Sequence, residues 1–134
     1  MESPHEGLTE VVRQQASVYP AILAVYLFGS QSTGKAKPES DLDLAILLFP
    51  GQEEDFPLLE LAVSLEKALG RRVDLTILNR AGELFKYQVR RHGTVLYDRA
   101  PRLRKHFEVR GRKSFEDFLY LHRRYIGRTF HHPA

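Results

Sequence analysis

The sequence predicts an α/β chain of the α+β type, in which a four-stranded sheet flanked by helices is followed by a basic helical tail. Three observations support this prediction. Helical periodicity and short apolar runs alternate along the chain in the order α-β-α-β-α-β-α-β. The 134 residues, 43% of them hydrophobic, suffice for one ordinary core. There is no cysteine, which excludes disulfide scaffolds and Cys-rich zinc modules.

The first helix and the first strand follow from side-chain spacing and from the residues that end each element. Apolar side chains recur at helical spacing within residues 6–17, so we expect an amphipathic helix that ends before Pro20. Residues 21–28 are almost all apolar and are followed by Gly29. This pattern is typical of a short strand that is covered on both faces.

The second predicted strand carries two acidic residues on one side. Residues 41–49 begin with strict alternation and end as a continuous apolar run, which predicts a strand whose second half is buried. Because successive strand residues point to opposite faces, Asp41 and Asp43 must face the same way. A core helix is expected over residues 58–69, with Gly70 at its C-terminal end.

The remaining elements are shorter. Residues 73–78 predict a third strand, Asn79 is expected to cap the helix that follows, and residues 94–97 predict a fourth strand. In the tail, residues 114–117 (Ser-Phe-Glu-Asp) resemble a capping box, so we expect a helix from there to about residue 127.

Charge divides the chain into two parts. Residues 99–134 contain ten Lys or Arg and three Asp or Glu, a net charge of +7, which leaves −4 for residues 1–98. We therefore expect a mildly acidic core over residues 1–98 and a basic helical extension over residues 99–134. Such an extension is usually a solvated helical face. An acidic partner or, less expected, RNA is the alternative.

No targeting or membrane segment is predicted. The first residues lack the basic and apolar regions of a secretory signal, so a cytoplasmic location is expected. The longest charge-free stretch, residues 14–34, is interrupted by Pro20 and Gly29, which favours a buried strand over a membrane span.

The loop after the first strand contains a lookalike of the P-loop motif. Residues 29–35 fit G-x-x-x-x-G-K, but the next residue is Ala36, where a P-loop needs a hydroxyl group to hold Mg²⁺. The pair Lys37-Pro38 follows at once and disfavours the helix that a P-loop requires. These differences argue against a P-loop nucleotide triphosphatase.

The same loop fits a different constellation of residues. Gly29-Ser30 is followed, after ten residues, by Asp41-Leu42-Asp43 at the start of a strand, and Asp74 lies on the next predicted strand. A Gly-Ser turn offers backbone N–H groups and a hydroxyl group to phosphate oxygens. Carboxylates held side by side repel each other unless a cation bridges them, and their hard oxygen atoms suit Mg²⁺ or Mn²⁺. Carboxylates on adjacent strands can hold two metal ions for phosphoryl or nucleotidyl transfer.

The segment LFGSQSTGKAKPESDLDLAIL, residues 27–47, resembles the signature of the DNA polymerase β-like nucleotidyltransferase superfamily, and the short chain resembles its minimal nucleotidyltransferase (MNT) branch. The resemblance covers residues 21–98 and implies a single nucleotidyltransferase domain with a mixed sheet. Lys37 stands where the family often has arginine, so the resemblance implies that it contacts the nucleotide.

The resemblance also implies a role for each residue of the constellation. Gly29 and Ser30 would hold the nucleotide's phosphates. Asp41 and Asp43 would ligate both of two Mg²⁺ ions, with Mn²⁺ as an alternative. Asp74 would ligate the catalytic ion and help to deprotonate the attacking hydroxyl group.

Three functions are open on this basis. The leading hypothesis, implied by the MNT resemblance, is an antitoxin that moves AMP from ATP onto a tyrosine hydroxyl of a HEPN-domain ribonuclease toxin and so neutralises it. The second is a nucleotidyltransferase that modifies a small molecule, as antibiotic-modifying enzymes do. The third is a catalytically silent module that binds its partner through the basic tail.

Overall fold

Helices and strands alternate as predicted along the chain. The computed structural model describes residues 6–29 and 41–130. In chain order the elements are α1 (Glu6–Ser17), β1 (Ile22–Phe28), β2 (Leu42–Leu48), α2 (Leu58–Leu69), β3 (Val73–Ile77), the 3₁₀ turn η2 (Leu78–Arg80), α3 (Glu83–His92), β4 (Thr94–Asp98) and α4 (Pro101–Phe130). The limits of α2 and the C-terminal end of α1 coincide with the predicted ones.

The four strands form one mixed sheet. Their order is β3-β2-β1-β4, with β1 antiparallel to both of its neighbours and β2 parallel to β3. The two central strands, β1 and β2, are buried along most of their length, which is why their sequences are almost continuously apolar. The predicted α+β class with a mixed four-stranded sheet is confirmed.

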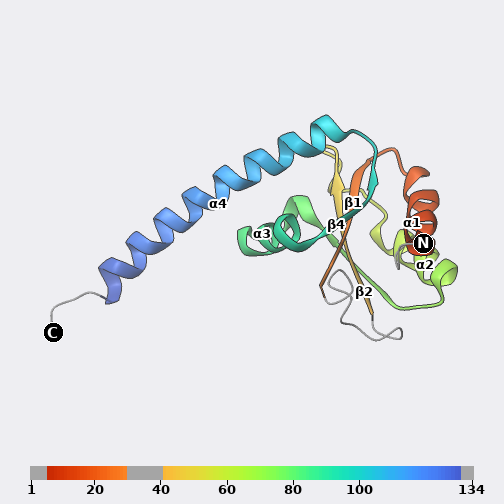
Figure 1. The fold of residues 1–134 in the computed structure, drawn as a ribbon, viewed down its shortest axis with the longest axis horizontal. Helices are drawn as coiled ribbons and strands as arrows, with labels where there is room; N and C mark the ends of the chain where they lie inside the picture. Colours follow the sequence, from red (N-terminus) through yellow and green to blue (C-terminus); the bar gives the residue numbers. More distant parts are fainter. Residues whose placement is uncertain (1–5, 30–40, 131–134) are drawn as a thin grey trace.

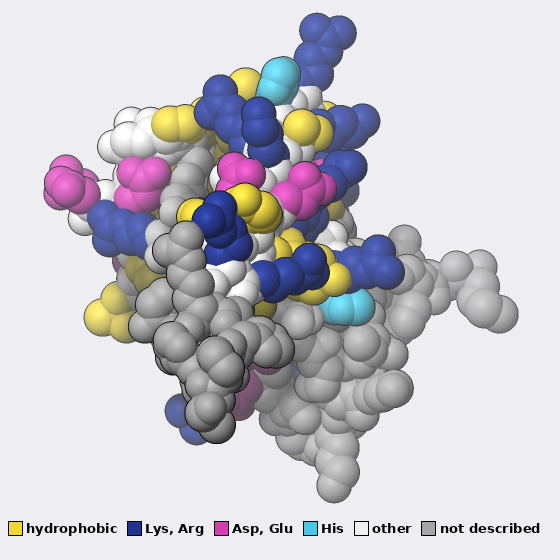
Figure 2. Space-filling model, turned by 90° about the vertical axis from the view of Figure 1, so that its left-hand side faces the viewer, with side chains coloured by type: hydrophobic (Ala, Val, Ile, Leu, Met, Phe, Trp, Pro, Cys, Tyr) yellow, Lys and Arg dark blue, Asp and Glu magenta, His cyan; other side chains and the backbone are white. Residues whose placement is uncertain are grey.

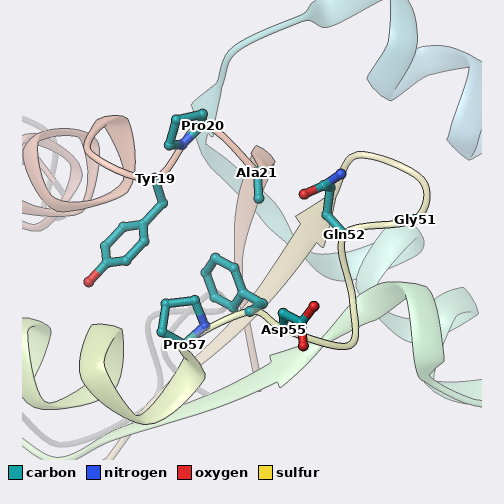
Figure 3. A pocket seen from close by; sticks show the side chains of 8 residues that line it. Tyr19, Pro20, Ala21, Gly51, Gln52, Asp55 and Pro57 are labelled. Carbon is teal, nitrogen blue, oxygen red and sulfur yellow. The ribbon is translucent and has the colours of Figure 1, made fainter.

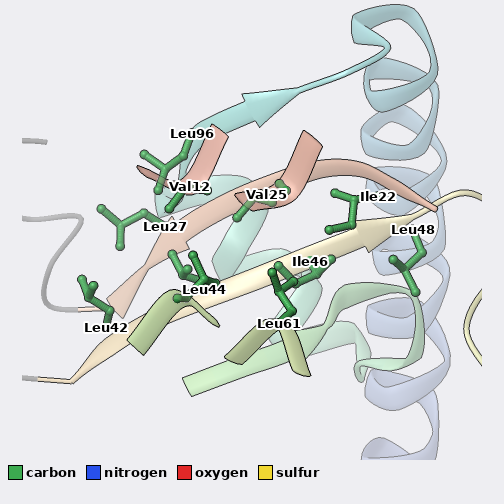
Figure 4. Packing of buried hydrophobic residues seen from close by; sticks show 12 residues of the cluster. Val12, Ile22, Val25, Leu27, Leu42, Leu44, Ile46, Leu48, Leu61 and Leu96 are labelled. Carbon is green, nitrogen blue, oxygen red and sulfur yellow. The ribbon is translucent and has the colours of Figure 1, made fainter. Parts of the chain in front are cut away.

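Helices cover both faces of this sheet (Figure 1). On the first face α1 and α2 enclose a cluster of buried side chains, shown in Figure 4, that includes Val12, Val25, Leu27, Leu44, Ile46 and Leu61. On the second face α3 and α4 cover a cluster that includes Leu23, Tyr26, Ala45, Leu47, Leu78 and Val89. Each fully buried aliphatic side chain contributes about 1.5–3 kcal/mol, so these two clusters dominate the stability of the fold.

The helix of the tail is longer than predicted. It does not begin at Ser114 but runs without a break from Pro101, and Ser114 is an exposed residue in its middle. Proline is well suited to the first turn of a helix, because its missing N–H group would have no partner there. No helix within the described ranges 6–29 and 41–130 is both long enough and apolar enough to cross a membrane.

Polar contacts hold the first half of α4 against the sheet. The Tyr26 hydroxyl donates a hydrogen bond to Glu108 Oε1 (3.0 Å). Arg104 donates to Asp98 Oδ2 (2.7 Å) and to Glu108 Oε1 (2.9 Å). Burial, reinforced by the Glu108 carboxylate, raises the pKa of Tyr26. Of these contacts, the one between Tyr26 and Glu108 links residues that are distant in the sequence, and the local pattern before Ser114 does not reveal it.

The prediction that Asn79 caps a helix is wrong. Asn79 lies in η2, and α3 begins after Gly82 without a side-chain cap. The Asn79 side chain instead accepts a hydrogen bond from the Leu48 N–H group and donates one to the Leu48 carbonyl oxygen, both at 2.8 Å. These two bonds satisfy the backbone at the end of β2, where strand pairing stops.

Candidate active site

Asp43 and Asp74 lie side by side on adjacent strands. They are register partners in the parallel pairing of β2 with β3, so their side chains leave the same face of the sheet. Asp43 alternates with Ala45 and Leu47, which places both acids on the face that α3 and α4 cover. The strand register therefore brings together two of the three carboxylates that the sequence places on neighbouring strands.

Electrostatic contact joins the third acid to this pair. Asp43 is half-buried, whereas Asp41, just before β2, and Asp74 are exposed. Burial raises the pKa of Asp43, and the negative charges of Asp74 and Asp41 raise it further. The three carboxylates thus concentrate negative charge at the end of the sheet where β2 and β3 begin. A cation at this position would relieve the repulsion.

Gly29 lies directly against the half-buried carboxylate. It follows Phe28, the register partner of Asp43 on β1, and has φ +77°, a conformation that side chains with a Cβ rarely adopt. A Cβ atom built on Gly29 would lie 2.7 Å from Asp43 Oδ2, closer than real contacts allow. Glycine is therefore favoured by the backbone conformation, and a side chain here would also have to displace the neighbouring carboxylate.

An aromatic pair forms an apolar border beside Asp43. Phe28 packs edge to face against Phe85 of α3, with ring centroids 5.0 Å apart. Both side chains belong to the cluster on the second face of the sheet. Neither residue was predicted to belong to the site. The one signal in the sequence is that Phe28 directly precedes Gly29, because the contact between Phe28 and Phe85 depends on the tertiary fold.

Two predicted residues of the site, Ser30 and Lys37, lie outside the described residues, so their assigned contacts with the nucleotide stay predictions. The metal assignment also stays a prediction. Among the residues that the structure describes, no three His, Cys, Asp or Glu side chains form a group that could hold a metal ion. The chemistry of the donors nevertheless fits Mg²⁺, because carboxylate oxygens are its preferred protein ligands. The negative charges of Asp74 and Asp41 also act on the Asp43 carboxyl group, and a cation would offset them.

A cavity elsewhere on the molecule is separate from these acids. It measures about 210 Å³ and is lined by the start of β1 and by the loop after β2, with Tyr19, Gln52, Asp55 and Pro57 around it (Figure 3). Because β1 and β2 are antiparallel, this is the opposite end of the sheet from Asp43. The cavity is therefore not part of the candidate site.

Comparisons with known proteins were made for the sequence and for the fold. The sequence matches the family described as Polymerase beta, Nucleotidyltransferase over residues 10–102. No curated protein sequence matches the chain. Three similar solved structures are of toxin–antitoxin pairs.

The first is a toxin–antitoxin crystallised with AMP-PNP; one of its chains is 28% identical over 92% of this chain and 95% of its own length, with a TM-score of 0.70. The second is the MntA–HepT toxin–antitoxin, with 26% identity over 90% and 95% and a TM-score of 0.68. The third is a tri-AMPylated HEPN toxin of Shewanella oneidensis in complex with its MNT antitoxin, with 27% identity over 91% of each chain and a TM-score of 0.64.

The resemblance inferred from residues 27–47 is thus confirmed by two independent comparisons. The family match spans more than half of the chain and includes Gly29, Asp41, Asp43 and Asp74. The similar folds extend this likeness to about nine-tenths of the chain, α4 included. The chain therefore belongs to the Polymerase beta nucleotidyltransferase family.

Proposed function

We propose that this protein is an antitoxin that transfers AMP from ATP to a hydroxyl group of a HEPN-domain toxin in the cytoplasm. The observation that carries the proposal is the placement of Asp43 beside Asp74 and against Gly29 in a chain of the nucleotidyltransferase family. This places carboxylates next to a glycine turn, the two parts that nucleotidyl transfer needs for metal ions and for phosphates.

The proposed chemistry is an in-line transfer at the α-phosphate of ATP. The acceptor oxygen forms a bond to the α-phosphorus, and the bond from that phosphorus to the oxygen bridging to the β-phosphate breaks, so that pyrophosphate leaves. The proton of the acceptor hydroxyl passes to Asp74 or to solvent. Mg²⁺ held by Asp41, Asp43 and Asp74 would lower the pKa of the acceptor hydroxyl and neutralise charge on the triphosphate.

Similar solved structures support the nucleotide and the partner. One was crystallised with AMP-PNP, an ATP analogue, and another contains a tri-AMPylated HEPN toxin. The likeness to these complexes covers at least nine-tenths of this chain. These complexes favour transfer of AMP to a protein over transfer to a small molecule.

The state of Asp43 argues against a catalytically silent module. Its pKa is raised because the fold holds it partly buried beside two other acids. An arrangement that destabilises the protein is typical of a functional site, since a binding module has no need for it.

The test is an AMP-transfer assay with a HEPN-domain toxin as the acceptor. We expect its intact mass to increase by one or more adenylyl groups in ATP and Mg²⁺, and the increase to disappear when EDTA removes the metal. Asp41→Asn with Asp43→Asn should abolish the transfer. The matched control, Glu54→Gln with Asp55→Asn, changes two exposed acids at the other end of the sheet and should leave the transfer unchanged.

Two results would count against the proposal. One is an unchanged mass of the HEPN-domain protein when this protein is folded and ATP is present. The other is a transfer that survives the double Asp substitution. A mass increase of kanamycin, used as a hydroxylated antibiotic in the same assay, would favour the small-molecule enzyme instead.

A further inference from the structure

The second half of α4 extends beyond the rest of the molecule (Figure 1). α4 contacts α3 through a stack of Phe115 on Tyr87, with ring centroids 4.4 Å apart and planes tilted by 13°. Phe118 and His122 continue this ring ladder along the same side of α4. One side of α4 thus contacts α3 and carries the stacked rings, whereas the opposite side is exposed to solvent.

The open side is what we call the distal face: Glu116, Asp117, Tyr120, Arg123 and Arg124. All five side chains are exposed, and Tyr120 retains 58% of its surface. Each lies within about 60° of Tyr120 around the helix, because residues three and four apart share a side. The Arg124 guanidinium donates to the Tyr120 hydroxyl (2.9 Å) and lies over its ring, so these two side chains are already ordered toward one another.

Charge is separated along this face. Two acids, Glu116 and Asp117, lie one turn before Tyr120, and two arginines, Arg123 and Arg124, lie one turn after it. The acids form no ion pair within the described part of the chain. If a second copy of the helix lies antiparallel with its Tyr120 opposite the first, each acid pair meets the arginine pair of the other copy. The distal face is therefore complementary to itself under a two-fold axis.

We propose that the distal face binds a second copy of this chain as an antiparallel helix pair centred on Tyr120. A parallel pair would bring arginine against arginine and acid against acid, which is unfavourable. The antiparallel pair also moves the basic first halves of the two α4 helices, residues 102–113, to opposite ends, where they repel least. α3 packs on the other side of α4 and leaves room for the second helix.

The same charges argue against two other occupants. Lys and Arg side chains are prominent on the side of the molecule that Figure 2 shows, which invites comparison with a nucleic-acid surface. Glu116 and Asp117, however, would face the phosphates of RNA and repel them. A uniformly acidic protein would meet the same two carboxylates. The distal face has two acids and two arginines on either side of the Tyr120 ring, so it fits a partner whose surface has the same arrangement. A second copy of this chain has that arrangement.

The expected interface is small. Three turns of paired helix bury less than the roughly 1,200 Å² that stable interfaces need, so the dimer should form in the micromolar range or above and depend on salt. Sedimentation equilibrium over a concentration series from low micromolar to submillimolar, at low salt, measures it directly.

Charge reversal tests the pairing and controls for folding. Glu116→Arg with Asp117→Arg (variant A) and Arg123→Glu with Arg124→Glu (variant B) each place like charges opposite one another, and each should weaken its own dimer at least about tenfold. Mixing A with B places arginines opposite acids at both ends, so the mixture should form A–B dimers again. Arg102→Glu with Lys105→Glu makes the same charge change as variant B at exposed positions outside the face and should dimerise like the wild type.

Wild-type protein that stays monomeric throughout the series would overturn the proposal, as would a mixture of A and B that stays monomeric. Another occupant would give a different result: the wild type alone would stay monomeric but would bind a HEPN-domain protein or single-stranded RNA, and variant B would lose that binding. This result would also overturn the proposed dimer. AMP transfer plays no part in these measurements, so failure of the dimer and failure of the proposed activity are separate results.

Discussion

The carboxyl group of Asp43 destabilises the fold that contains it. Its folded-state pKa is raised, by burial first and then by Asp74 and Asp41. The native protein therefore holds this proton to a higher pH than the unfolded chain does, and stability falls as the pH rises from the ordinary carboxyl range through the raised pKa. The whole of this cost is present once the pH lies above the raised pKa.

Asp43→Asn should therefore stabilise the protein at neutral pH while abolishing transfer. We expect a gain of less than about 1 kcal/mol, because the group is only half-buried and solvent screens its repulsion. Urea unfolding measures the gain, which should vanish below the ordinary carboxyl pKa. Asp55→Asn, an exposed acid at the other end of the sheet, is the control. A variant less stable than the wild type at neutral pH would show that Asp43 makes a stabilising contact.

Gly29→Ala should cost more stability than a glycine conformation alone explains. Gly29 and Gly51 both have positive φ, +77° and +85°, so alanine strains the backbone at either position by about 1 kcal/mol or more. Only at Gly29 does the new Cβ also collide with Asp43 Oδ2. Gly51→Ala is thus the matched control in thermal unfolding, and adding Asp43→Ala to Gly29→Ala should recover the difference. Equal losses at the two glycines would contradict the contact.

At the scale of the elements, local pattern predicted what local forces decide. The continuous apolar run of residues 21–28 and the alternating start of residues 41–49 became β1 and β2, because strands buried on both faces need such sequences. The errors occurred where contacts outside the local pattern contribute. The first half of α4 is held against the sheet by hydrogen bonds that involve Tyr26 and Asp98, and the periodicity of the tail does not contain these contacts.

Asn79 shows the same limit and offers a test. A helix cap and the observed bridge to the Leu48 backbone both use the side-chain oxygen of asparagine. Only the bridge also uses the side-chain NH₂ group, which donates to the Leu48 carbonyl oxygen. Asp caps helices as well as Asn does, so Asn79→Asp would be neutral for a cap. For the bridge, it removes a donor and places a carboxylate against a carbonyl oxygen. We expect the substitution to lower the free energy of unfolding, measured with urea, by about 1–3 kcal/mol. An unchanged free energy of unfolding would contradict the bridge and favour a helix cap.

At the scale of the whole molecule, the site arises from strand order. Asp74 lies beside Asp43 only because β3 pairs in parallel with β2 after the α2 crossover. The alternation of residues 41–49 predicted that Asp41 and Asp43 share a side, whereas the pairing of this strand with the one that carries Asp74 was an assumption drawn from chain order. The Gly29 contact could not be predicted at all, since it needs the antiparallel register that pairs Phe28 with Asp43.

The position of α4 bears on the boundary proposed at residue 98. Phe107 packs into the cluster on the second face of the sheet, and Glu108 receives the Tyr26 hydroxyl. A chain ending after Asp98 exposes that cluster and leaves the Tyr26 hydroxyl without its partner. We therefore propose that the first half of α4 is a structural part of the core and that the second half is the extension.

Two truncations test this division. The chain ending after Asp98 should lose several kcal/mol of a total stability on the order of 5–15 kcal/mol, and should aggregate or unfold without cooperativity. The chain ending after Phe115 keeps the stack on Tyr87 and should unfold cooperatively, with a loss below about 2 kcal/mol. Because it lacks the distal face, it should also be monomeric. Circular dichroism during a urea titration compares the two truncated chains. If the chain that ends after Asp98 unfolds cooperatively at the same urea concentration as the full-length chain, residues 1–98 form an independent domain.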